Sequence, residues 1–490
     1  MQKKTSLVRT RIAPSPTGFL HIGTARVALF NWLFTRKNKG SFVMRIEDTD
    51  EERSKPEFEK TIIEGLKWLD IYWDEGPDID GEYGPYKQSE RKELYKKEIE
   101  RLLVSGSAYY CFCTKEELET YREGELKKGV VPIYSRRCRT ISKDEAQKRI
   151  DKGDLAVIRL RVGENMVIEF DDVIRDHIKV NSDTIGDIVI AKNILTPLFA
   201  LAGVIDDAYM KISHVIRGDD HLPNTPKQIL IADALGYSRP LYAHLPLVLS
   251  EDRKKLSKRL NETSLLEYKN KGYLPEAVVN FIVLLGWHPE GDEEIFSQKE
   301  LIESFTLRRV QKAGAVFDIE KLNWINSVYI KKLSFEKLKA LIIDFVPKEW
   351  LDKSEIFEKA LALEQERIRI LSDFKETAKF FFELPPYEAS LLLWKKGSAI
   401  TPPSLIRENL EKIYKVLELA KEDQFIKNDI ETIISNIMDS LKKGEMLWPL
   451  RVALSGQATS PSPYEILEVL GKNESLARIE EALKKINTLV

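Results

Sequence analysis

The sequence predicts an α/β fold for the first two thirds of the chain and a helical fold for the rest. All but four of the 24 glycines precede residue 320, where tight turns between α/β units are expected. In this part, strand-like runs alternate with helical patterns, and these runs are Ser41–Ile46, Ala156–Arg161 and Ile185–Ala191. After residue 320, apolar residues recur at helical spacing through charged segments. The 490 residues suggest about three or four domains.

The N-terminal residues are predicted to form a strand, a loop and a helix. Residues 7–24 read LVRTRIAPSPTGFLHIGT, and the following helix has one apolar face made by Ala25, Ala28, Leu29, Trp32 and Leu33. Gly18 and Gly23 would let a ligand approach the backbone, and the helix N-terminus favours phosphate. His21 could donate a hydrogen bond to a phosphate oxygen as charge builds there. An ordinary turn with a surface histidine is the alternative.

The three cysteines are clustered, which argues against a disulfide framework. Cys111, Cys113 and Cys138 place three sulfurs within 28 residues, close enough for a zinc knuckle with one further ligand. Three buried thiols without metal are the alternative.

A basic loop follows the apolar segment Leu245–Ser250. It reads EDRKKLSKR and spans Glu251–Arg259. Lys255 and Lys258 could lie along a triphosphate and neutralise departing pyrophosphate. A solvated run of charge is the alternative interpretation.

The last third is predicted to form two helical units. Apolar residues at helical spacing include Leu361, Ile368, Leu371 and Phe374. The pair Pro402 and Pro403 should separate the two units, because proline removes a hydrogen-bond donor and disfavours helix in the preceding residue. Trp448 is expected in the core.

Composition excludes several classes of protein. Hydrophobic residues at 43% and charged residues at 31% exclude a disordered chain. A net charge of −2 offers no bulk electrostatic argument for a nucleic-acid partner. No apolar stretch reaches the roughly 20 residues of a membrane-spanning helix, and the N-terminus lacks a secretory h-region. The cytoplasm is therefore the expected compartment.

Taken together, PSPTGFLHIG and KLSKR resemble the paired signatures of class I aminoacyl-tRNA synthetases. The further motifs RIEDTDEERS, YWDEGPD, GPYKQSER, VIRGDDHLPNTPKQ, GYLPEAVVNF, LLGW and PLRVALSG occur in the order found in bacterial glutamyl-tRNA synthetases. The resemblance extends through nearly the whole chain.

This resemblance implies a particular domain order. A Rossmann-type, parallel-sheet catalytic domain would carry an inserted acceptor-binding domain, followed by a stem-contact domain and an all-α anticodon-binding region. The expected boundaries are 1–110 and 190–245 for the two catalytic halves, 111–189 for the insertion, 246–325 for the stem-contact domain and 326–490 for the anticodon-binding domains.

The resemblance also implies a reaction. The glutamate carboxylate would attack the α-phosphorus of ATP, giving glutamyl-adenylate and pyrophosphate, and the glutamyl group would pass to the terminal ribose of tRNA(Glu). A bound tRNA is expected to be needed before the adenylate forms. Catalysis would be positioning and charge stabilisation by His21, Lys255, Lys258 and Mg²⁺. The family members are usually cytoplasmic monomers.

Substrate-binding residues follow from the matched motifs. Arg11 would pair with the side-chain carboxylate of glutamate, Ser15 and Glu47 would hold its ammonium, and Arg217 would contact its carboxylates. The full implied set for glutamate is Arg11, Ala13, Ser15, Glu47, Phe199 and Arg217, and the set for ATP is His21, Gly23, Asp220, His221 and Lys258.

Phe199 departs from the family pattern, which usually has tyrosine there. Loss of the hydroxyl removes a donor worth about 1–3 kcal/mol toward a charged partner. Asn193 or a neighbouring backbone group is the candidate replacement.

Two further assignments concern metal and RNA. In related members the fourth zinc ligand is a histidine, where this chain has Thr140, or a tyrosine, which corresponds to Tyr134. Arg367 matches an arginine that probes the third anticodon base, with a solvated helical arginine as the alternative. Arg367 favours use of tRNA(Glu) alone, but charging of tRNA(Gln) as well stays open.

Other protein classes agree less well with the sequence. A truncated relative that modifies a tRNA base lacks the anticodon region, and glutaminyl-tRNA synthetases have a signature resembling PEPNGYLHIGH. A non-catalytic RNA-binding paralogue would not need His21 and KLSKR, and a simple nucleotidyltransferase would not need the long helical region.

Overall fold

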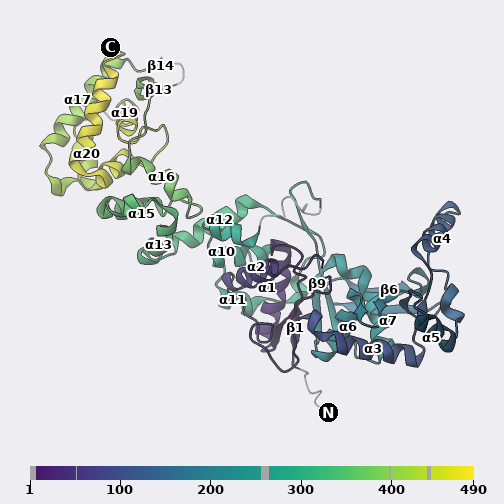
Figure 1. The fold of residues 1–490 in the computed structure, drawn as a ribbon. Coiled ribbons are helices and arrows are strands. Elements are labelled where there is room, and N and C mark those ends of the chain that lie inside the picture. Colours follow the sequence, from purple (N-terminus) through teal and green to yellow (C-terminus); the bar gives the residue numbers. More distant parts are fainter. Residues whose placement is uncertain (1–6, 51, 255–263, 397–398, 439–442, 490) are drawn as a thin grey trace. The chain divides into compact units, whose positions relative to one another are not determined.

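The computed structural model describes residues 7–50, 52–254, 264–396, 399–438 and 443–489 (Figure 1). The chain forms two compact units. The first comprises Met1–Lys269 and Pro275–Leu322, and the second comprises Asn270–Leu274 and Asn323–Val490. The last passage of the chain from the first unit to the second, between Leu322 and Asn323, lies within helix α12 (Ile319–Lys331).

A mainly parallel layer of strands organises the first unit. Its strands are β1 (Arg9–Ile12), β2 (Ser41–Met44), β5 (Val167–Asp172), β6 (Asp176–Asn181), β9 (His214–Gly218) and β10 (Leu241–Leu245). β1 pairs in parallel with β2, β10 pairs in parallel with both β9 and β5, and β6 is antiparallel to β5. The backbone N–H of Ser213 donates to the carbonyl of Arg9 over 3.0 Å, which joins β9 to β1. The carboxyl ends of β1 and β9 therefore lie at one edge, where ligands of open α/β sheets bind.

The predicted strand, loop and helix at the N-terminus are confirmed. Helix α1 (Ile22–Lys37) follows β1, and its residues Ala25, Ala28, Leu29 and Leu33 are completely buried. The other helices of this unit are α2 (Pro56–Trp68), α3 (Lys92–Ser105), α4 (Lys115–Lys127), α5 (Lys143–Asp151), α6 (Phe199–Tyr209), α7 (Thr225–Leu235), α9 (Leu265–Asn270), α10 (Pro275–Leu284) and α11 (Gln298–Ser304).

A second, antiparallel sheet spans residues 108–197, beyond the bounds 111–189 that were predicted for the insertion. Its order is β3 (Ala108–Cys111), β4 (Val157–Leu160), β7 (Val189–Asn193) and β8 (Thr196–Pro197). The run Ile185–Ala191, expected as a strand, is extended only from Val189. Its first residues close a turn in which the N–H groups of Ile185 and Gly186 both bond the carbonyl of Ser182. The β5–β6 hairpin also falls within 111–189, yet it extends the parallel layer through β10.

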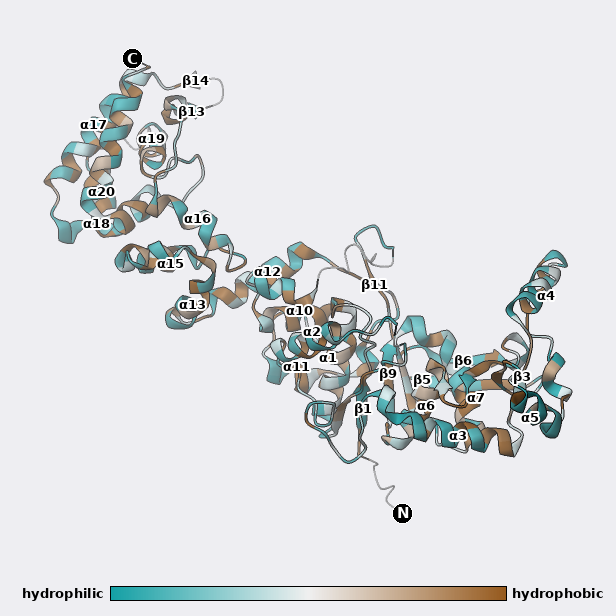
Figure 2. Ribbon diagram, in the orientation of Figure 1, coloured by the Kyte–Doolittle hydropathy of each residue, from teal (hydrophilic) through white to brown (hydrophobic). Residues whose placement is uncertain are grey.

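The longest apolar stretch of the sequence forms the buried helix α10. Figure 2 shows this helix as largely hydrophobic, and its residues 277–283 are all buried. Nearby, β11 (Val248–Leu249) pairs in parallel with β12 (Ala315–Val316). Within the described ranges, no helix combines the length and the hydropathy needed to cross a membrane.

The second unit is mostly helical, as predicted. Its remaining helices are α13 (Phe335–Ile342), α14 (Lys348–Leu351), α15 (Ser354–Glu364), α16 (Asp373–Phe382), α17 (Pro403–Leu419), α18 (Lys427–Ser435), α19 (Lys443–Ser455) and α20 (Pro463–Ile486). Helix α17 starts at Pro403, where a new unit was expected. A short ladder of β13 (Lys395–Lys396) with β14 (Ala399–Ile400) means that the region is not entirely α-helical.

A buried carboxylate on α6 ties together three segments of the first unit. Asp206 is completely buried and accepts hydrogen bonds from Gln88 Nε2 at 2.8 Å, Arg91 Nε at 2.7 Å and the Tyr95 hydroxyl at 2.9 Å. Arg45 Nε lies 3.6 Å from the same carboxylate. Removing one partner of such a buried group leaves the others as uncompensated charges.

We therefore predict that Asp206→Ala lowers the free energy of unfolding of the first unit by about 3–5 kcal/mol. The measurement is urea unfolding followed by circular dichroism. Glu64→Ala is the control, because Glu64 belongs to an exposed pair with Lys60 on α2 and should give a much smaller loss. Similar losses for the two variants would contradict the prediction.

Candidate active site

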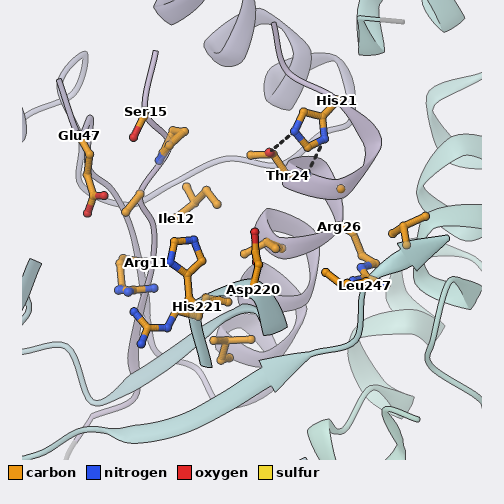
Figure 3. A pocket seen from close by; sticks show the side chains of 18 of the residues that line it. Arg11, Ile12, Ser15, His21, Thr24, Arg26, Glu47, Asp220, His221 and Leu247 are labelled. Carbon is orange, nitrogen blue, oxygen red and sulfur yellow. Dashed lines mark hydrogen bonds between the residues drawn. The ribbon is translucent and has the colours of Figure 1, made fainter. Parts of the chain in front are cut away.

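A cavity of about 320 Å³ lies beyond the carboxyl ends of β1 and β9, next to the start of α1 (Figure 3). It brings together every described residue that the sequence assigns to glutamate or ATP. These lining residues are Arg11, Ala13, Ser15, His21, Gly23, Glu47, Phe199, Arg217, Asp220 and His221. Lys255 and Lys258 lie outside the described residues, but Leu247 and Val248, which precede their loop, also line the cavity.

His21 is the residue that caps helix α1. Its backbone is extended, its Nδ1 accepts the Thr24 N–H over 3.4 Å, and its Nε2 lies 3.3 Å from Thr24 Oγ1. A Cβ at position 23 would lie 3.1 Å from the imidazole, so Gly23 leaves room for the ring at the first turn. The imidazole and the helix N-terminus thus lie at the same end of the cavity, an arrangement suited to phosphate.

Ser15, Glu47 and Arg11 lie on the other side of the cavity from His21 (Figure 3). Glu47 is fixed by the completely buried Arg45, whose Nη2 donates to Glu47 Oε1 over 3.0 Å and whose Nη1 donates to Asp207 Oδ1 over 2.8 Å. Burial raises the pKa of Glu47, with Arg45 acting in the opposite direction. Burial also opposes ionisation of Asp207, but Arg11 and Arg45 outweigh it and lower that pKa.

Arg45 and Asp207 contact the cavity residues Glu47 and Arg11, and sequence reasoning missed both contacts. The signals were present as an arginine two residues before Glu47 and as the second acid of the Asp206–Asp207 pair. Arg11 Nε also donates to Asp207 Oδ1, over 3.1 Å, so this one acid contacts both Arg11 and Arg45. Neither signal in the sequence indicates this shared contact.

Arg217 differs from Arg11 in the side chains that hold it. It is 7% exposed, and its Nε donates to His244 Nε2 over 3.2 Å while its Nη2 donates to Thr225 Oγ1 over 2.7 Å. Among the described residues, no carboxylate lies within ion-pair distance of it. Burial, together with the like charge of Arg11, lowers its pKa to about 10. A buried guanidinium of this kind favours a ligand carboxylate.

Phe199 stands at the edge of the cavity and is 37% exposed, with its ring centroid 5.4 Å from that of His221. Asn193 does not replace the missing hydroxyl. Its side chain is exposed, it accepts the N–H of Leu195 over 2.9 Å, and it does not line the cavity.

Arg26 lines the cavity, although the sequence did not reveal it. It is buried on α1, its Nη1 donates to the Leu285 carbonyl over 3.0 Å, and its Nη2 donates to the Pro246 carbonyl. Burial lowers its pKa to about 10. The only signal in the sequence was a charged residue within the otherwise apolar run ARVALF.

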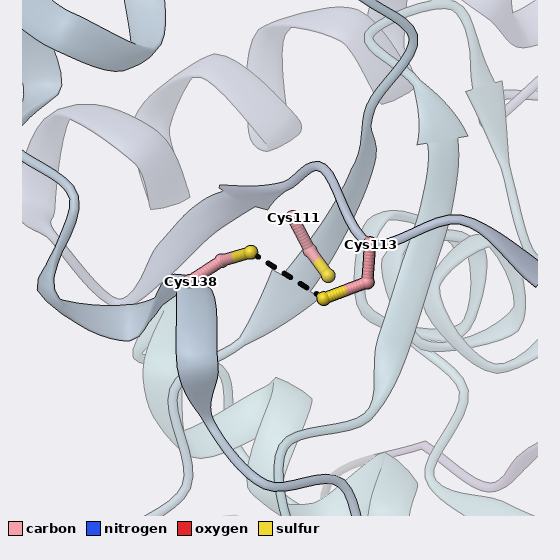
Figure 4. A group of neighbouring side chains, drawn as sticks. All are labelled: Cys111, Cys113 and Cys138. Atoms are coloured by element: carbon pink, nitrogen blue, oxygen red, sulfur yellow. Dashed lines mark hydrogen bonds between the residues drawn. The ribbon is translucent and has the colours of Figure 1, made fainter. Parts of the chain in front are cut away.

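The three cysteines lie close together (Figure 4), and Tyr134 contacts them. Their sulfurs lie within 4.8 Å of one another, and Cys113 Sγ is 3.6 Å from Cys138 Sγ. The Tyr134 hydroxyl oxygen accepts from Cys111 Sγ over 3.2 Å and lies 3.6 Å from Cys113 Sγ. Four donors this close fit a tetrahedral ion with metal–sulfur distances of about 2.3 Å.

Arg367 lies in a turn after α15, so the alternative of a solvated helical arginine does not hold. Its side chain is 46% exposed, and its Nε lies 3.4 Å from the buried carboxylate of Glu364. Trp448 is half-buried and donates from Nε1 to the Leu391 carbonyl over 2.9 Å.

Comparison with protein families defines the class. Residues 7–324 match the catalytic domain of class I tRNA synthetases (E and Q), and residues 335–483 match an anticodon binding domain. The fold and its cavity are thus those of a class I aminoacyl-tRNA synthetase.

Individual relatives identify the family within this class. Glutamate–tRNA ligase 2 of Caldicellulosiruptor saccharolyticus is 43% identical over 98% of this chain and 99% of its own length, and the glutamate–tRNA ligase of Natranaerobius thermophilus is 41% identical over 99% and 100%. The crystal structure of a glutamate tRNA ligase from Elizabethkingia meningosepticum, in complex with its amino acid, superposes with a TM-score of 0.86 at 34% identity, covering 99% of this chain and 100% of that one. The chain belongs to the glutamate–tRNA ligase family, and it is an enzyme that forms aminoacyl-tRNA.

Proposed function

We propose that this enzyme activates L-glutamate with ATP and transfers it to the 3′ end of tRNA(Glu), acting as a cytoplasmic monomer. One observation carries the proposal: a single cavity presents the guanidinium groups of Arg11 and Arg217 beside Ser15 and the buried Glu47. Two cations and an acid match the two carboxylates and the ammonium of glutamate.

The glutamate would lie with its carboxylates toward Arg217 and Arg11 and its ammonium toward Glu47 and Ser15. Arg45 holds Glu47 in place, so the ammonium meets a fixed carboxylate. Phe199 contributes an apolar surface at the cavity edge and no hydrogen-bond donor.

For the chemical step, an oxygen of the glutamate carboxylate forms a bond to the α-phosphorus of ATP while the bond to pyrophosphate breaks. No protein nucleophile is needed. His21 would donate to the phosphate as charge develops, and Gly23, Asp220 and His221 would contact ATP. Burial and the nearby Arg217 lower the pKa of His221, which favours its neutral ring. Lys255, Lys258 and a Mg²⁺ ion would neutralise pyrophosphate charge. The ribose hydroxyl of tRNA then attacks the carbonyl of the adenylate, and AMP leaves.

A substitution at position 21 can distinguish a catalytic role of His21 from its role as the helix cap. We predict that His21→Asn lowers kcat for ATP–pyrophosphate exchange about 100-fold to 1,000-fold, although asparagine is a good helix N-cap. The affinity for tRNA, measured by filter binding, should stay within about twofold of wild type. His177→Asn, an exposed histidine outside the cavity, is the control. Normal activity in His21→Asn would assign His21 to capping alone.

For tRNA range, we propose that the enzyme discriminates and that Arg367, held by Glu364, contacts the anticodon. Purified tRNA(Glu) should accept labelled glutamate, tRNA(Gln) should not, and glutamine should be a substrate with neither. ATP–pyrophosphate exchange should require tRNA. Arg367→Gln should raise charging of tRNA(Gln) relative to tRNA(Glu), while the exposed Lys359→Gln should not. Charging of both tRNAs by wild type would make the enzyme non-discriminating, and charging of neither would refute the function.

For the cysteine cluster, we propose a structural zinc ion held by Cys111, Cys113, Cys138 and Tyr134. Mass spectrometry of native protein prepared without chelator should give about one zinc per chain. Cys138→Ser should lose the metal, and Tyr134→Phe should bind it more weakly. A folded, fully active wild type without metal would refute the proposal.

A further inference from the structure

A buried aspartate and histidine stand behind Arg217. His244 on β10 is completely buried, and its Nδ1 lies 2.6 Å from Oδ2 of Asp172, the last residue of β5. On the other side of the ring, Nε2 lies 3.2 Å from Arg217 Nε and 3.0 Å from Thr225 Oγ1. Neither Asp172 nor His244 is among the residues that line the described cavity.

The hydrogen bonds define a single pattern of donors. The Asp172 carboxylate can only accept, so His244 Nδ1 carries the proton and Nε2 carries the lone pair. Nε2 therefore accepts from Arg217 Nε. The hydroxyl of Thr225 accepts from Arg217 Nη2 and can donate its own proton to the His221 carbonyl 3.5 Å away, so the one lone pair of Nε2 stays with Arg217. Burial lowers the pKa of His244, which favours this neutral ring.

The carboxylate of Asp172 is itself fixed. Its Oδ1 accepts the backbone N–H groups of Ile174 at 2.9 Å and Arg175 at 2.8 Å, which leaves Oδ2 directed at His244. The backbone after β5 thus determines the orientation of the acid, and the acid determines the tautomer of the histidine.

We infer that Asp172 and His244 are positioning residues that hold the guanidinium of Arg217 toward a substrate carboxylate, an inference that rests on the proposed function of Arg217. The Nε and Nη2 groups are held from behind, and Nη1 has no hydrogen-bond partner among the described residues. A guanidinium fixed on one edge loses less conformational freedom when it binds a ligand on the other.

This arrangement also keeps the charge of Arg217 available. A carboxylate in direct contact, such as Asp207 provides for Arg11, would compete with the substrate. The nearest acid in the Arg217 network is instead separated from it by a neutral imidazole ring. The relay holds Arg217 without neutralising it at close range.

The test is Asp172→Asn. Because two backbone N–H groups fix the oxygen at the Oδ1 position, the amide NH₂ must face His244 Nδ1. The ring proton then moves to Nε2 and confronts the N–H of Arg217. KM for glutamate in aminoacylation should rise about tenfold to a hundredfold, while kcat and KM for ATP stay within about threefold. Nitrogen NMR of the histidine ring should show the protonated nitrogen change from Nδ1 to Nε2.

Two further variants distinguish the proposed effect on Arg217 from a general structural effect. His244→Asn can still donate to Asp172 but offers Arg217 no equivalent acceptor, so it should raise KM for glutamate similarly. Asp171→Asn, the exposed neighbour on β5, should leave all constants unchanged. Parallel increases in both KM values with a lower melting temperature would mean a merely structural role and would overturn the inference.

Arg217→Lys separates this inference from the proposed function. A raised KM for glutamate is expected, and the double variant with Asp172→Asn should show no further increase. An unchanged KM in Arg217→Lys would refute the assignment of Arg217. A raised KM in Arg217→Lys with normal values in Asp172→Asn would refute the relay alone.

Discussion

The active-site cavity depends on one buried cation, Arg45. Its guanidinium has no exposure to solvent and contacts Glu47, Asp206 and Asp207. Burying these charges is unfavourable unless each is paired, so the network is stable only in the geometry that satisfies all its members. Glu47 is thereby fixed at the cavity, Asp207 is fixed beside Arg11, and Asp206 connects the same network to Arg91. The site and the packing of the first unit are consequently one electrostatic structure.

The sequence predicted local structure and the cavity residues well, because both follow from short patterns. Apolar spacing predicted α1, and motif matches selected ten residues that do line one cavity. The connections behind them could not be predicted. Arg45 and Asp207 are 162 positions apart, and Asp172 and His244 are 72 apart. Contact between Asp172 and His244 requires that β5 pair with β10, and no local pattern specifies which strands become neighbours.

The helical region shows a different limit of periodicity. Leu361 and Ile368 are seven residues apart, as on one helical face, and both are buried, yet helix α15 ends between them. Asp373 accepts the backbone N–H groups of Arg369 and Ile370 and so stabilises the turn before α16. The interruption places Arg367 in a turn, where its side chain reaches both solvent and the buried carboxylate of Glu364.

Among the described residues, no internal carboxylate pairs with Arg217, and this has a consequence for substrate selection. Under the proposed assignment, an uncharged analogue such as an amide would displace water from this guanidinium without supplying an anion. That leaves a desolvated cation unbalanced, and sites that need a polar or charged partner reject ligands lacking it strongly. Rejection of the wrong amino acid would then need neither a steric clash nor a proofreading step, because the unmet charge alone disfavours the complex.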